Sequence, residues 1–306
     1  MRDALMKSLF MLAEKDPNVM LLTGDLGYGV FEEFEKKYPE QYLNIGVAEQ
    51  NMMGVAAGLA LEGKIIFTYS IGNFPTLRCL EQIRNDACYH ELNINIIATG
   101  GGFSYGGLGM SHHATEDLAI MRALPGVTVV SPCTEREVEL ATVELSLRKG
   151  VGYLRIDKTK AELESDSDDF KIGRARTLVK GTDYTIFVTG GIAEEAVKAS
   201  KILEESKISL NVVSIHTLKP LDARFIQNEI KSKKGIIVIE EGVLIGGLGS
   251  SICELCVDSG ITINNFKRLG IDDHYSSEVG SQEFLRDKHK LNSRAIVTEV
   301  LKFVNK

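Results

Sequence analysis

The sequence lacks a surplus of positive charge. Its 306 residues include 35 lysines and arginines against 42 aspartates and glutamates, and the net charge is −7. Proteins that hold nucleic acid through a basic surface usually show the opposite balance. We therefore expect no nucleic-acid partner for this chain.

Long apolar runs are missing as well. No apolar stretch reaches the roughly 20 residues that a membrane-spanning helix requires. The first residues carry an acid, Asp3, where a signal peptide would have its apolar core. These two absences predict a cytoplasmic protein with no membrane partner.

Cysteine is scarce, with five residues in the whole chain. Cys253 and Cys256 have the spacing of a metal-binding pair, but they lie in a helical pattern and no second pair accompanies them. An odd number of cysteines in a long chain is not typical of a disulfide framework. We expect reduced, mostly buried thiols and no metal site.

What the sequence does contain is a regular alternation of strands and helices. Short apolar runs typical of strands buried on both faces occupy residues 19–23, 65–69, 94–99, 127–131 and 151–156. Helical patterns lie between them, over residues 3–14, 50–61, 77–89, 116–123 and 135–149. Such alternation predicts an α/β fold with a mostly parallel sheet flanked by helices.

An acidic stretch with few apolar residues, 160–169, interrupts this pattern. A second alternation follows, with strands predicted at 184–189, 210–215 and 235–239 and helices at 193–205, 222–231 and 247–259. We therefore predict two α/β domains, 1–160 and 172–306, joined by an acidic linker over 161–171. A surface loop within a single domain is the alternative for the acidic stretch.

One carboxylate stands at a junction between a strand and a helix. Glu49 follows an extended stretch over 42–46 and precedes the helix of small residues over 50–61. Walled by apolar side chains, this carboxyl would lose its water, and such a group can hold or share a proton near neutral pH. From this motif alone, a charge that complements the helix dipole is the favoured interpretation.

Three glycine-rich turns occupy residues 24–29, 100–109 and 242–249. None has the spacing of a phosphate-binding or dinucleotide-binding loop. The second turn ends in His112 and His113, and a histidine there can shuttle protons near neutral pH. Phe74 precedes a helix that carries Arg78; its ring suits stacking on a flat heterocycle or a place in the core.

Together these elements resemble the C-terminal half of a transketolase, over essentially the whole chain. In the first domain the resemblance rests on Thr-Gly-Asp-Leu at 23–26, Gly-Val-Ala-Glu-Gln-Asn-Met at 46–52, Phe74, Arg78, Glu-Gln-Ile-Arg at 81–84, and His112 with Glu-Asp-Leu-Ala at 116–119. In the second domain it continues through Thr-Gly-Gly at 189–191, Leu-Lys-Pro-Leu-Asp at 218–222, Glu-Glu at 240–241 and Gly-Gly-Leu-Gly at 246–249.

The resemblance implies a thiamine-diphosphate pyrimidine-binding domain followed by a transketolase C-terminal domain. The Gly-Asp-Gly and Asn signature of the family's diphosphate-binding domain is absent. The chain then resembles one half of a split enzyme, whose partner is an N-terminal diphosphate-binding subunit. That partner would hold most of the contacts to Mg²⁺ or Ca²⁺. Two copies of each chain are the simplest assembly.

The resemblance also assigns roles to single residues. Glu49 matches the family's glutamate, which hydrogen-bonds the pyrimidine and favours the imino form that deprotonates the thiazolium carbon. Asp25, Phe74 and Arg78 match positions around the cofactor, and His112 matches the residue that handles protons during catalysis. Finally, Arg2 and Arg155 match positions that hold the phosphate of a sugar substrate.

Three positions depart from the family's pattern, because Gly100, Leu108 and Gly29 replace polar residues of many transketolases. We therefore predict transfer of a two-carbon ketol unit between sugar phosphates, with a non-standard sugar on one side. One alternative is the β subunit of a 2-oxo-acid dehydrogenase or a deoxyxylulose-phosphate-synthase-like enzyme. A second is a non-catalytic assembly subunit.

Overall fold

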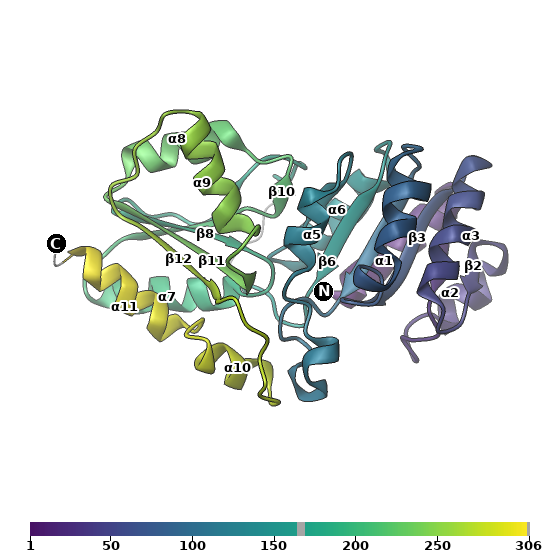
Figure 1. Ribbon diagram of the computed structural model, residues 1–306, viewed down its shortest axis with the longest axis horizontal. Helices are drawn as coiled ribbons and strands as arrows, with labels where there is room; N and C mark the ends of the chain where they lie inside the picture. Colours follow the sequence, from purple (N-terminus) through teal and green to yellow (C-terminus); the bar gives the residue numbers. More distant parts are fainter. Residues whose placement is uncertain (164–168, 305–306) are drawn as a thin grey trace.

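The computed structural model describes residues 1–163 and 169–304, and two sheets organise them (Figure 1). The first sheet has the strand order β10-β5-β6-β4-β3-β1-β2, and the second has the order β12-β11-β8-β9-β7. All pairs of neighbouring strands are parallel except β10 with β5 and β7 with β9. The predicted fold class, two α/β units with mostly parallel sheets flanked by helices, is confirmed.

The strands of the first sheet are β1 (Val19–Thr23), β2 (Tyr42–Asn44), β3 (Ile65–Ile71), β4 (Ile94–Thr99), β5 (Thr128–Val130), β6 (Gly152–Ile156) and β10 (Thr217–Lys219). Its helices are α1 (Arg2–Lys15), α2 (Glu32–Lys37), α3 (Glu49–Leu61), α4 (Leu80–Gln82), α5 (Asp117–Ala123) and α6 (Glu135–Ser146). The helix predicted over 77–89 is broken instead, into a 3-10 turn (Leu77–Cys79), α4 and a π-helical turn (Ile83–Cys88).

The second unit contains β7 (Arg176–Val179), β8 (Tyr184–Thr189), β9 (Leu210–Ser214), β11 (Gly235–Val243) and β12 (Phe266–Ile271). Its helices are α7 (Ala193–Glu205), α8 (Ala223–Ser232), α9 (Leu248–Asp258), α10 (Gln282–Lys288) and α11 (Ser293–Val304). In Figure 1, α8 and α9 lie above this sheet, and α7, α10 and α11 lie below it.

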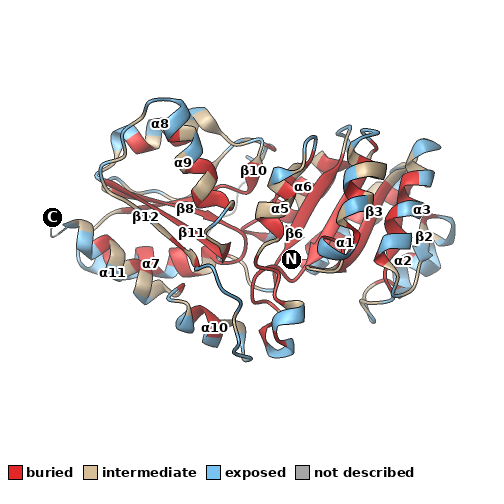
Figure 2. Cartoon of the chain, in the orientation of Figure 1, coloured by how far each residue is buried: buried red, intermediate tan, exposed pale blue. Residues whose placement is uncertain are grey.

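Each sheet has an apolar core on both faces, and its central strands are buried along their length (Figure 2). On the first sheet, Leu9 of α1 and Val138 of α6 pack on one face, and Met53 of α3 and Met121 of α5 pack on the other. The second of these cores continues into the other unit, as far as Ile252 of α9. The two units therefore share an apolar core.

The connection between the units has two features that bear on the predicted domain limits. Strand β10 belongs to the second half of the sequence, yet it pairs with β5 at the edge of the first sheet. Of the predicted linker over 161–171, residues 164–168 lie outside the described residues. Ala161, at its start, is buried, and its N–H donates to the carbonyl of Cys133.

The five cysteines are free thiols, and three of them are buried. In the described part of the chain, no group of three or more His, Cys, Asp or Glu side chains is placed to hold a metal ion. Nor does that part contain a helix long and apolar enough to cross a membrane.

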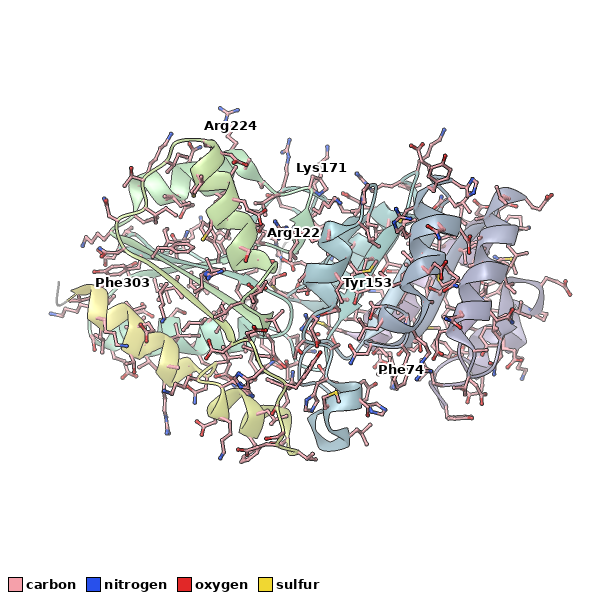
Figure 3. The ribbon with its side chains drawn as sticks, viewed as in Figure 1. Phe74, Arg122, Tyr153, Lys171, Arg224 and Phe303 are labelled. Atoms are coloured by element: carbon pink, nitrogen blue, oxygen red, sulfur yellow. The ribbon has the colours of Figure 1, made fainter. Side chains whose placement is uncertain are left out.

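A buried network of ion pairs and hydrogen bonds connects the two units, and Arg155 of β6 lies at its centre. The guanidinium of Arg155 lies 3.2 Å from Oδ1 of Asp157 and 3.2 Å from Oδ1 of Asp117. Its remaining Nη2 donates to the backbone carbonyl of Glu241, on β11 of the second unit, at 2.9 Å. Tyr153, labelled in Figure 3, completes the group by donating its hydroxyl to Asp117.

The side chain of Glu241 carries the network further into the second unit. One carboxylate oxygen accepts from the N–H of Phe103 at 2.6 Å, and the other accepts from Nε of Arg286 at 2.6 Å. Both Glu241 and Arg286 are almost fully buried. A buried charge costs several kcal/mol unless it is paired, so each of these groups depends on the others.

Replacing Glu241 with Ala should therefore destabilise the protein severely. The change leaves the guanidinium of Arg286 without its closest carboxylate and the N–H of Phe103 without its acceptor. We expect the free energy of unfolding, measured by urea denaturation, to fall by about 3–5 kcal/mol. Glu283→Ala, an exposed position on the neighbouring helix α10, should change it by no more than about 0.5 kcal/mol. Equal effects of the two changes would contradict the account of the network.

Candidate active site

Four of the predicted site residues follow the carboxyl ends of neighbouring parallel strands. Asp25 follows β1, Phe74 follows β3, and the glycine-rich turn that ends at His112 follows β4. Glu49 is the first residue of α3, which follows β2. Loops at this edge of a parallel sheet are where ligands bind in open α/β folds.

Glu49 is buried, with 1% of its surface exposed. Its Oε1 accepts a hydrogen bond from the hydroxyl of Ser70 at 3.2 Å, and its Oε2 pairs with Nη1 of Arg78 at 2.8 Å. The sequence predicts the burial of this carboxyl but not its ion pair with Arg78. The pair explains how the charge is tolerated there, because an opposite charge offsets part of the desolvation cost.

Arg78 connects Glu49 to an aromatic cluster. The carbon at the centre of its guanidinium lies 4.2 Å from the centroid of the Phe74 ring, within the range of a cation–π contact. Phe74 also contacts the imidazole of His112, with ring centroids 5.2 Å apart and an angle of 69° between the ring planes. Four of the predicted site residues thus form one continuous chain of contacts: Glu49, Arg78, Phe74 and His112. Phe74 is labelled in Figure 3.

The two adjacent histidines have different surroundings. His113 is buried; its Nε2 faces the carbonyl of Gly106 at 3.3 Å and its ring packs against Phe103. His112 is partly exposed, and its Nδ1 lies 3.0 Å from the hydroxyl of Ser111. Burial, His113 and Arg78 all lower the pKa of His112. The lowered pKa of His112 favours the neutral imidazole over the charged form.

Asp25 lies beside this cluster rather than within it. Its backbone has φ of 54°, and its carboxylate accepts a hydrogen bond from the amide of Asn44 at 3.0 Å. The neighbouring Gly24 approaches Glu49, because a Cβ on that glycine would lie 3.6 Å from Oε1 of Glu49. Asp25 is exposed, and its contact with the cofactor stays a prediction.

The two arginines predicted to hold a sugar phosphate have other partners in the structure. Arg155 is 2% exposed, and its nitrogens contact Asp117, Asp157 and the backbone of Glu241. The placement of Arg155 argues against a contact with a substrate phosphate, because the guanidinium would first have to give up these interactions. Arg2 is half exposed and its ion pair is with Asp3, at 3.7 Å; its role stays a prediction.

Close packing of side chains explains why two positions in the turn after β4 are glycine. A Cβ on Gly100 would collide with the ring of Tyr105, and one on Gly101 would collide with the guanidinium of Arg155. Both positions therefore exclude any larger residue. Of the other two departures from the family's pattern, Leu108 is 59% exposed, and the N–H of Gly29 donates to Glu32 at 2.7 Å.

The groups present suit one half of the expected cofactor. A buried carboxylate beside an aromatic ring fits the ring nitrogen and the flat face of an aminopyrimidine. In the described part of the chain no group of three or more His, Cys, Asp or Glu side chains is placed to hold a metal ion, and how the diphosphate is held stays a prediction.

Comparison with known families divides the chain into two family domains. The model of the transketolase pyrimidine-binding domain matches residues 1–162, and the model of the transketolase C-terminal domain matches residues 173–296. The chain belongs to the transketolase family. Within that family it corresponds to the C-terminal half of a split enzyme, as the relatives show.

Similar proteins include a putative transketolase C-terminal section of Methanocaldococcus jannaschii, 36% identical over 100% of this chain and 96% of the relative. A 6-deoxy-6-sulfo-D-fructose transketolase subunit of Clostridium sp. is 32% identical over 97% of this chain and 92% of its own length. A solved structure described as "Split gene transketolase, inactive beta4 tetramer" is 34% identical, with a TM-score of 0.87, and the match covers 99% of this chain and 97% of that one.

The synthase alternative is not favoured by these comparisons. A 1-deoxy-D-xylulose-5-phosphate synthase of Syntrophotalea carbinolica is 30% identical over 97% of this chain, but over only 47% of its own length. The split transketolase subunits match at somewhat higher identity and over nearly their whole length. The function of a split transketolase subunit is therefore the better supported of the two.

The ion pair between Glu49 and Arg78 can be tested by a double-mutant cycle. Arg78→Met leaves the buried Glu49 carboxylate without its cation and should lower the free energy of unfolding by about 1–2 kcal/mol, a range limited by the half-exposed guanidinium. In the Glu49→Gln background the same change should cost much less, because no charge is left unpaired. Urea denaturation of the four proteins measures both costs, and equal costs would show that the pair does not form in solution.

Proposed function

We propose that this chain and a diphosphate-binding partner form a two-chain transketolase that transfers a two-carbon ketol unit between sugar substrates. The observation that carries the proposal is the buried Glu49 carboxylate, held by Ser70 and Arg78 and followed by Phe74 and His112. When bound, thiamine diphosphate would supply the nucleophilic thiazolium carbon that ketol transfer requires.

Glu49 activates the pyrimidine in this proposal. Its carboxyl holds a hydrogen bond to the ring nitrogen in a site with little water, where such a bond is strong. Ser70 fixes the orientation of the carboxyl through Oε1, so the hydrogen bond needs no reorganisation when the cofactor arrives. Phe74 provides an apolar face for the ring, and His112 accepts and returns a proton at the substrate.

The partner chain supplies what the described residues do not, namely the ligands of Mg²⁺ or Ca²⁺ and of the diphosphate. The similar solved structure is described as an inactive β4 tetramer, which supports a requirement for a second kind of chain. Two copies of each chain would place every cofactor between a pyrimidine-binding and a diphosphate-binding surface.

The sugar is not an ordinary ketose phosphate in this proposal. One relative is named for a sulfonated fructose, and this chain carries Gly100, Leu108 and Gly29 at positions where polar residues are common in the family. A complex that turns over ordinary ketose phosphates at full rate would contradict this part of the proposal. Release of carbon dioxide from pyruvate would instead favour the enzymes that decarboxylate 2-oxo acids.

Glu49→Gln should abolish most of the activity of the complex with its partner. The amide keeps the size of the side chain but cannot hold the proton that the pyrimidine requires, so we expect kcat to fall about a hundredfold or more. Glu62→Gln, at the exposed end of the same helix, serves as the matched control. Unchanged activity of the Glu49 variant would favour a non-catalytic assembly subunit.

The isolated chain should bind thiamine diphosphate weakly, with a Kd well above the micromolar range. It contacts only the pyrimidine half, so thiamine without the diphosphate should bind it about equally well. Calorimetric titration of the isolated chain with both compounds measures this. Micromolar binding of thiamine diphosphate, or a strong preference for it over thiamine, would contradict the assignment of the diphosphate to the partner.

A further inference from the structure

The glycine-rich turn after β4 carries an aromatic ring next to His112. The centroid of the Tyr105 ring lies 6.4 Å from that of the His112 imidazole, and the planes of the two rings make an angle of 63°. Tyr105 is only partly buried, whereas Phe103, two positions earlier in the same turn, is buried. A ligand that reaches His112 can therefore touch the ring of Tyr105.

Packing holds this ring in place. A Cβ on Gly100 would collide with Cε2 of Tyr105, so the ring fills the space in which the first atom of any side chain at that position would stand. The ammonium of Lys158 lies 4.0 Å from the ring centroid. Two backbone hydrogen bonds between Gly102 and Ala114, at 2.7 and 2.9 Å, close the turn around the ring. The ring therefore has little freedom to move aside.

The strand order gives the direction in which a substrate extends from His112. Strand β4 lies between β3 and β6 in the first sheet. Phe74, which serves the cofactor in the proposed function, follows β3, and Lys158 follows β6. Tyr105 connects His112 to Lys158. Since the cofactor occupies the side of Phe74, the rest of a sugar that reacts at His112 extends toward β6, along Tyr105.

We propose that the ring of Tyr105 limits the length of the aldose that the enzyme takes as acceptor. The inference rests on the proposed function and deepens it, because it names a residue that decides which sugars fit. A short acceptor ends before the ring, but a longer one has to displace it. Displacement is unfavourable, because the ring is already packed against Gly100 and a well-packed site does not absorb added volume. The bulk of the ring, not its hydroxyl, sets the limit.

The test compares a short and a long acceptor, glyceraldehyde phosphate and ribose phosphate, each phosphorylated at its last carbon. The complex with the partner chain is supplied with hydroxypyruvate as the ketol donor, and the ketose products are quantified by mass spectrometry. In Tyr105→Val, the ratio of kcat/KM for ribose phosphate to kcat/KM for glyceraldehyde phosphate should rise at least about tenfold, because the longer chain gains room. Tyr105→Leu should raise the ratio less.

Two controls separate the ring from other effects. Tyr105→Phe keeps the ring and should leave the ratio unchanged. Tyr89→Val removes an exposed tyrosine outside this group of contacts and should leave the ratio unchanged as well. Because the expected result is a gain for the longer acceptor, a variant that merely misfolds cannot produce it.

The possible outcomes separate the inference from the function on which it rests. A wild-type complex that uses both acceptors equally well overturns the inference. So does an unchanged ratio, or an equal loss for both acceptors, in Tyr105→Val and Tyr105→Leu, because Tyr105 would then only support the turn. A rise of the ratio in Tyr105→Phe overturns it too, since the hydroxyl would be responsible. A wild-type complex that transfers no ketol unit to either acceptor refutes the proposed function and the inference with it.

Discussion

The burial of the Glu49 carboxylate is the constraint on which the candidate site depends. A carboxylate with almost no contact with water requires partners, and it has two, the Ser70 hydroxyl and the Arg78 guanidinium. Arg78 in turn lies over Phe74, and Phe74 packs against His112. The buried carboxylate thus fixes Arg78, and ring contacts connect Arg78 to Phe74 and His112.

The second unit contacts the turn that leads to His112. Glu241 of β11 binds the backbone of Phe103, at the start of the turn that carries His112, and Arg155 binds the backbone of Glu241. The turn is therefore fastened across the junction of the two units. A C-terminal unit that contributes none of the predicted catalytic groups still fixes the position of one of them.

Much of the fold could be predicted from the sequence, because its strands are continuous apolar runs. The bounds of β1, β4, β8 and α7 agree with the predictions residue for residue. Strand β10 could not be predicted, since three residues at a sheet edge leave no periodic pattern. The break in the helix after Phe74 could not be predicted for a different reason, because a π-helical turn keeps an ordinary helical pattern of apolar residues.

For the site, too, some features could be predicted from the sequence and others could not. Local patterns place Glu49 and His112 at the ends of strands, and the structure brings both to one edge of the sheet. The pairings are not local: Arg78 lies 29 positions from Glu49, and Glu241 lies 86 positions from Arg155. Arg155 looks like a phosphate ligand in the sequence because only its charge is visible there. Its carboxylate partner Asp157 is two positions away, but Asp117, 38 positions away, meets it only in the folded chain.

The central claim is that Glu49 activates the cofactor, and one measurement addresses it most directly. Hydrogen–deuterium exchange at the thiazolium carbon of bound thiamine diphosphate can be followed by NMR after acid quenching, without any sugar present. In the complex with the partner chain, the account predicts an exchange rate at least about a hundredfold slower for Glu49→Gln than for the wild type. Equal rates in the two complexes would contradict it.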